Sequence, residues 1–148
     1  MISNILDFQS EYLHVGRKHE DWRFRDVQVA QSGLTALMDI SSPFVSSHDR
    51  EGFHLSIFTT QEACVELLVF WICQKACIQS KPGEAWMKEM SSSCSTPIRD
   101  SQDIRIELDV KKSRVGNGFL YAVGCFKIEG PNGGLFNVEL KGLMENHA

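Results

Sequence analysis

The segment from Ala63 to Ile78 constrains this chain more than any other. It contains no glycine or proline, and apolar side chains occupy nearly every face of the helix that it would form. A helix that is hydrophobic all round has to be buried. Because 148 residues are enough for one core, the segment predicts one domain, residues 1–148, built around a central helix. Its longest apolar run, Ala63–Cys73, is interrupted by Glu66 and is too short to cross a bilayer.

Alternating apolar and polar residues predict strands on both sides of this helix. The expected strands are Trp22–Ala30 with a bulge at Arg25–Asp26, Leu34–Ile40, Ile104–Ser113, Gly118–Gly130 and Gly134–Met144. Gly-Asn-Gly and Pro-Asn-Gly-Gly turns join the last three into an antiparallel meander. Such a sheet could bury the helix by curling round it, which makes the predicted fold class α+β.

The remaining segments give weaker signals. Phe53–Phe58 is expected to be a short strand or an extended approach to the helix, and Glu84–Met90 a short helix. Residues 1–20 are expected to form an N-terminal arm or a short helix, with apolar positions over Ile2–His14. A capping-box pattern from Thr59 to Glu62 predicts that the central helix begins there.

Composition excludes several classes of function. A net charge of −4 and a pI near 5.7 argue against a nucleic-acid-binding protein. The five cysteines show no spacing typical of a metal site, so neither a metal nor a cofactor is expected. The N-terminus lacks the basic start of a signal peptide. The missing signal peptide and the odd number of thiols together predict that the protein resides in a reducing cytoplasm. The short apolar run Ala63–Cys73 predicts that it has no membrane span.

The order of elements and the motif "VELLVFW" resemble the hotdog superfamily of acyl-thioester enzymes, in which an antiparallel sheet wraps around a long central helix. Within it, "CVELLVF" and "PNGGLFNVELKGL" are similar to the FcoT-type long-chain acyl-CoA thioesterases, over roughly Gly52 to Met144. Where that branch has His and Asn before Val-Glu-Leu, this chain has Gln61 and Ala63. The resemblance implies an acyl-CoA or acyl-carrier-protein substrate and a homodimer or higher homo-oligomer that pairs through edge strands.

Glu66 is the main catalytic candidate. In hotdog thioesterases a helix carboxylate activates water or attacks the carbonyl, and apolar neighbours such as Val65 and Phe70 would raise the pKa of Glu66 by burial. Alternatively, Glu66 lies on the one solvent-facing or dimer-facing stripe of the helix. Glu62 is a second catalytic candidate, although the capping box explains it too.

A second branch of the superfamily supplies a third catalytic candidate. Val65-Glu66 also resembles the Val-Glu of the hydroxyacyl-carrier-protein dehydratases, which place a His upstream, here His54. That function requires His54 to lie near Glu66 in space. A dehydratase or isomerase, or a non-catalytic acyl-CoA-binding protein, therefore remain alternatives to the thioesterase.

Four residues are candidates for substrate binding. The N-terminus of a helix carries unpaired N–H donors that can hold the thioester oxygen, and Thr60 and Gln61 are expected to supply donors there. Phe58 and Phe70 are expected to line a slot for the acyl chain, although core packing also explains both.

Overall fold

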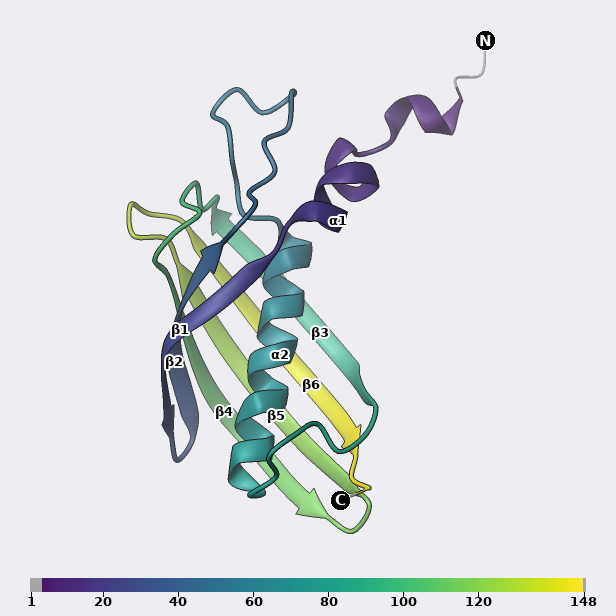
Figure 1. The fold of residues 1–148 in the computed structure, drawn as a ribbon, viewed down its shortest axis with the longest axis vertical. Helices are drawn as coiled ribbons and strands as arrows, with labels where there is room; N and C mark the ends of the chain where they lie inside the picture. Colours follow the sequence, from purple (N-terminus) through teal and green to yellow (C-terminus); the bar gives the residue numbers. More distant parts are fainter. Residues whose placement is uncertain (1–3, 148) are drawn as a thin grey trace.

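The computed structural model describes residues 4–147, and a long helix, α2 (Ile57–Lys75), lies across the concave face of an antiparallel sheet (Figure 1). Within the described residues the sheet has six strands in the order β1-β2-β4-β5-β6-β3. Their bounds are β1 Trp22–Ala30, β2 Gly33–Ile40, β3 Ala85–Thr96, β4 Ile104–Gly116, β5 Phe119–Glu129 and β6 Leu135–Glu145. The predicted α+β architecture of a sheet around a central helix is confirmed.

The core is formed by apolar side chains that alternate with exposed residues along the strands. In β4 the side chains of Ile104, Ile106 and Leu108 are buried, whereas the intervening Arg105 is exposed. From the helix, Leu67, Leu68 and Trp71 are among the residues that pack against this layer, each about 2% exposed. Burying apolar surface on both elements at once is the main favourable free-energy contribution to such a layer.

The five strands predicted by alternation are present, with ends shifted by a few residues. The expected bulge is also confirmed, because the register of β1 against β2 shifts between Arg25 and Gln28. Asp26 there adopts a φ of 53°, a left-handed conformation that non-glycine residues rarely take.

The prediction of a short helix over Glu84–Met90 is wrong. Ala85–Met90 belong to β3, which pairs with β6 along its length. A bulge between Met87 and Glu89 breaks the alternation, and the serine-rich second half of the strand carries few apolar side chains. Both features remove the period-two signal by which a strand is recognised in a sequence.

The central helix begins earlier than the capping-box pattern predicted. Ser56 is the N-cap, and its hydroxyl accepts a hydrogen bond of 3.0 Å from the Phe58 N–H. The chain approaches this cap in an extended conformation, with the Leu55 N–H donating to the Ile98 carbonyl at 2.8 Å. The helix therefore starts where the chain leaves this contact, and Glu62 has no capping role.

The N-terminal arm consists of short helical turns, η1 (Ile5–Phe8), η2 (Tyr12–Gly16) and α1 (Arg17–His19). The part of the predicted helix Ile2–His14 that precedes residue 4 lies outside the described residues. The arm is anchored by Glu20, which is 7% exposed and accepts hydrogen bonds from the Thr59 and Tyr12 hydroxyls at 2.7 and 3.2 Å. It therefore packs against the first turn of α2.

Candidate functional site

The sheet covers only one side of α2, and the other side carries apolar residues. Phe58 and Phe70 are 41% and 40% exposed, and Val65 and Val69 are half-buried. An exposed apolar surface of this kind is typical of a site that binds a ligand or another protein chain. The predicted acyl-binding residues Phe58 and Phe70 therefore lie on a common surface of the helix and are not part of the core.

Two hollows lie along this uncovered side. The first, of about 330 Å³, is near the start of the helix. Its lining residues are Arg17, Phe58, Gln61, Glu62, Val65, Glu66 and Met90. The second, of about 370 Å³, extends toward the end of the helix and is bordered by Val69, Phe70 and Ala85 among others. Of the described residues, Val65 and Glu66 line both hollows.

Glu66 projects from this uncovered side and is exposed to solvent. The expectation that it would be buried in apolar surroundings is wrong for the single chain, and the structure matches the alternative of an exposed stripe. The physical reason is the helix period, which directs Glu66 away from the sheet while Leu67 and Leu68 point toward it. Its carboxylate accepts a 3.3 Å hydrogen bond from the indole Nε1–H of Trp22 in β1.

Trp22 is one residue of this site that sequence reasoning missed; Arg17 is another. The place of Trp22 in an alternating strand indicated an apolar core position, and its side chain is indeed partly buried against the core. The sequence gives no indication that the indole N–H meets a carboxylate 44 residues away. The one available signal is general, since a buried Trp usually finds a hydrogen-bond acceptor for its N–H.

Glu62 pairs with Arg17 of the arm, and both side chains are partly exposed. The Arg17 guanidinium also lies over the Phe58 ring, 6.0 Å from its centroid. This cluster closes the first hollow at the end nearest the arm. Glu62 is thus already held by a cation, whereas Glu66 accepts its hydrogen bond from a neutral donor.

Thr60 and Gln61, the two predicted hydrogen-bond donors at the start of the helix, differ in whether a donor faces a hollow. Thr60 is buried, and its N–H and hydroxyl both donate to the Ser56 carbonyl, at 3.0 and 2.8 Å. It therefore has no donor directed at a hollow. Gln61 lines the first hollow with Glu66, and its amide Nε2 donates to the Ser92 hydroxyl of β3 at 3.0 Å.

His54 lies in a separate hollow of about 530 Å³ at the N-terminal end of α2, which Glu66 does not line. Its Nδ1 is 2.6 Å from the Asp49 carboxylate, and Arg99 donates to both oxygens of that carboxylate at 2.8 and 2.7 Å. These hydrogen bonds, from Arg99 first and then from His54, lower the pKa of Asp49 to about 2. Within one chain, His54 and Glu66 are therefore not brought together as the dehydratase interpretation requires.

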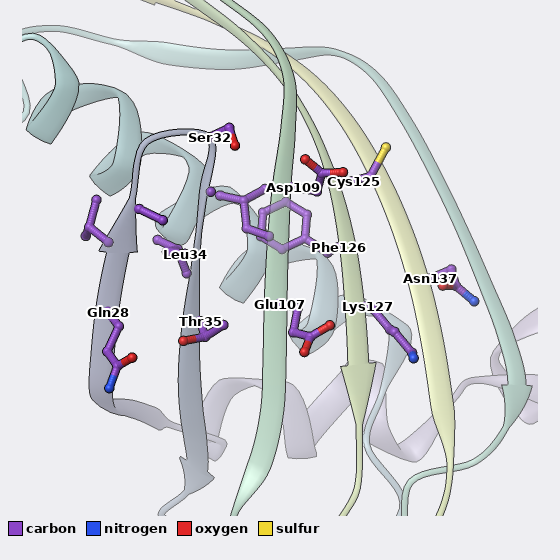
Figure 2. Close-up of a pocket in the computed structure, with 14 residues that line it drawn as sticks. Gln28, Ser32, Leu34, Thr35, Glu107, Asp109, Cys125, Phe126, Lys127 and Asn137 are labelled. Atoms are coloured by element: carbon purple, nitrogen blue, oxygen red, sulfur yellow. The ribbon is translucent and has the colours of Figure 1, made fainter.

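A further hollow, of about 670 Å³, lies on the outer face of the sheet, opposite α2 (Figure 2). Thr35, Glu107, Lys127 and Asn137 are register neighbours on four adjacent strands and form a polar row across it. Lys127 is paired with Glu129 at 2.8 Å. The sheet separates this row from Glu66, so it is not part of the candidate site.

Residues 4–147 lack two other classes of site. No cluster of three or more His, Cys, Asp or Glu side chains there could hold a metal ion, and no helix there is long and apolar enough to cross a membrane. All five cysteines are free, with Cys64 and Cys73 buried and Cys77 and Cys94 exposed. Burial raises the pKa of the Cys64 thiol, which keeps it protonated and unreactive.

Several solved structures are similar to this fold. A mutant thioesterase from Pseudomonas aeruginosa matches with a TM-score of 0.54 and 16% identity, over 95% of this chain and 90% of that one. The chain has the hotdog fold. A thioesterase family protein from Silicibacter pomeroyi matches with a TM-score of 0.52 and 10% identity, over 96% and 93% of the two chains.

A hypothetical thioesterase from Streptococcus pneumoniae, crystallised with coenzyme A, matches the hotdog chain described here with a TM-score of 0.54 and 10% identity, over 86% and 89% of the two chains. No protein-family model and no curated protein matches the sequence. At these identities the likeness shows the fold alone, and the chemistry depends on the residues of this hotdog protein.

Proposed function

We propose that this hotdog protein hydrolyses an acyl thioester, either acyl-CoA or acyl-carrier protein, with Glu66 as the catalytic base. One observation carries the proposal: Glu66 borders both hollows on the uncovered side of α2. A thioester carbonyl at Glu66 would have the acyl group in one hollow and the thiol-bearing part in the other. Phe58 and Phe70 supply apolar walls on either side.

The reaction needs one base and one set of donors. The Glu66 carboxylate takes a proton from water, whose oxygen attacks the carbonyl carbon, and the carbon–sulfur bond then breaks. The proton on Glu66 passes to the departing thiolate, which leaves as a free thiol. The carboxylic acid product then releases its remaining proton to solvent and becomes a carboxylate. A bound acyl chain would exclude water from the apolar walls and strengthen each electrostatic interaction at the carbonyl.

Gln61 is the best-placed donor for the carbonyl oxygen. Its amide carries two N–H groups, of which one donates to Ser92. That bond holds the side chain in the first hollow, beside Glu66, and the second N–H is suited to an oxygen that becomes negative in the transition state. In this proposal Gln61 takes the role that the sequence assigned to both Thr60 and Gln61.

The same proposal includes the partner and the assembly. The resemblance to the FcoT-type branch favours fatty acyl-CoA, and the Streptococcus pneumoniae neighbour was crystallised with coenzyme A. The sheet ends in β3 on one side, an edge strand with unpaired backbone groups. We expect two copies to pair through β3 as a homodimer, which light scattering on the purified chain would test.

The decisive experiment measures thiol release from saturated acyl-CoAs of increasing chain length. Glu66→Gln keeps the shape of the side chain and removes the base, so we expect kcat/KM to fall by about 100-fold, the lower end for loss of a general base. Glu139→Gln, an exposed glutamate on the outer face of β6, is the matched control and should leave kcat/KM unchanged. Equal activity of the two variants would exclude Glu66 from the mechanism.

Acyl-CoA binding without thiol release in the wild-type chain would instead favour the non-catalytic acyl-binding alternative. The separation of His54 from Glu66 makes the dehydratase or isomerase alternative weaker. Hydration of an enoyl-CoA by the wild-type chain, measured as a loss of enoyl absorbance, would favour that alternative.

A further inference from the structure

A narrow apolar crevice continues from the second hollow into the space between α2 and the sheet. The two share Val69 and Ala85, so the crevice begins where the hollow ends. It measures about 20 Å³, room for about one water molecule. The lining is apolar throughout and comes from α2, β3, β5 and β6. Apolar cavities of this kind stay dry and accept apolar ligands.

Met87 lines this crevice from β3. It lies directly opposite Gly142 in the pairing of β3 with β6. A Cβ atom at Gly142 would meet the Met87 Cε at 2.7 Å and its Sδ at 3.3 Å, so the thioether rests on the glycine backbone. The neighbouring Ala85 and Ala122 are also small. Because methionine is unbranched and flexible, its side chain can be displaced more easily than the helix or the strands around it.

We propose that Met87 closes the acyl end of the groove and sets the chain length, which makes a medium-chain acyl thioester of about eight carbons the preferred substrate. This inference rests on the proposed function. From Glu66 to Ile72, the last helix residue that lines the crevice, the helix advances by about 9 Å. An extended chain covers about 1.2 Å per bond, so about seven bonds reach from the thioester carbon to the far end of the crevice.

The apolar crevice decides which end of the groove receives the acyl chain. The first hollow has Gln61 and the Arg17–Glu62 ion pair in its wall and shares no lining residue with the crevice. The second hollow leads into the crevice. The acyl chain therefore runs toward the C-terminal end of α2.

Two variants move this barrier in opposite directions. Met87→Ala removes the thioether and should move the preferred length up by about two to four carbons. Gly142→Ala adds a methyl group 2.7 Å from the Met87 Cε, which pushes the thioether further into the crevice and should move the preferred length down by about two carbons. The opposite signs distinguish a change in groove length from a general loss of stability, and thermal unfolding of each variant checks that it folds.

Binding is measured by titration calorimetry with S-alkyl-CoA thioethers, which lack the carbonyl and are not hydrolysed. In the wild-type chain affinity should rise about fourfold per methylene, as expected for a fully buried CH₂ group, and stop rising near eight carbons. Met90→Ala is the matched control, because Met90 is on the same strand and lines the first hollow but neither the second hollow nor the crevice. It should leave the preferred length where it is.

The inference is overturned if Met87→Ala leaves the preferred length unchanged, or if Met90→Ala shifts it equally. Hydrolysis of the matching acyl-CoA series separates this result from the proposed function. A length shift in binding without any hydrolysis supports the role of Met87 and rejects the thioesterase. If the chain hydrolyses acyl-CoA and Met87→Ala prefers the same acyl length as the wild-type chain, this inference is rejected and the thioesterase proposal stands.

Discussion

Glu20 and Glu66 are two carboxylates beside the same helix, and they differ in almost every physical respect. Glu20 is 7% exposed and accepts hydrogen bonds from the Tyr12 and Thr59 hydroxyls and from the Phe44 N–H. Glu66 is exposed and accepts one 3.3 Å bond from Trp22. The comparison shows that the buried carboxylate is occupied by donors of the protein itself, whereas the exposed one is available to a substrate.

The buried carboxylate has its acceptor positions occupied by the protein itself. Burial raises the pKa of Tyr12, so its hydroxyl stays protonated and can continue to donate. A buried acceptor satisfied in this way stabilises the fold because leaving its donors unpaired would be costly. Glu66 instead has room for water and substrate, at the junction of two hollows.

The largest expected difference between the two is in stability. Glu20→Gln replaces one carboxylate oxygen by an amide that cannot accept a hydrogen bond, so one of its donors loses its acceptor. We expect a loss of about 2 kcal/mol in the free energy of unfolding, within the range for such losses at charged acceptors. Urea unfolding of both variants measures this, and Glu66→Gln should change it by less than about 0.5 kcal/mol. A reversed order would mean that Glu66 is the structural carboxylate.

The sequence predicted the buried helix well because its signal is local. Sixteen successive residues without glycine or proline and with apolar side chains on nearly every face leave few alternatives to a central helix. The strands with regular alternation were predictable for the same reason. β3 was not, because its bulge at Met87–Glu89 and its serines conceal the period of two.

The environment of each glutamate could not be read from the sequence in the same way. Glu66 has apolar neighbours along the chain, which suggested burial. In the structure a residue of the helix faces the sheet or faces away from it, and Glu66 faces away. Glu20 lies in a polar stretch, yet tertiary contacts with Thr59 and Phe44 bury it. Long-range packing decides such cases, and local periodicity does not report it.

A smaller effect is expected from the donor that orients Glu66. Trp22→Phe keeps an aromatic ring in β1 and removes the indole N–H. Because the bond is exposed and 3.3 Å long, we expect about a fivefold loss in kcat, equivalent to about 1 kcal/mol. KM should change little if the bond acts on the base and not on substrate binding. Trp86→Phe, on an exposed outer position of β3, is the matched control.

The smallest expected effect is on the pH dependence of stability and concerns a third carboxylate, Asp49, which contacts His54 near the N-terminal end of α2. Arg99 and His54 lower its pKa from 3.8 to about 2, so the ionised form is favoured in the folded chain. The stability that this contributes is fully present above about pH 4 and is lost as the pH falls toward 2. Unfolding free energies measured from pH 5 to pH 2 should therefore fall less steeply in Asp49→Asn than in the wild-type chain. Identical slopes would show that Asp49 is not held by Arg99 and His54 in solution, which would remove the structural explanation for His54 and make it a stronger candidate for a base.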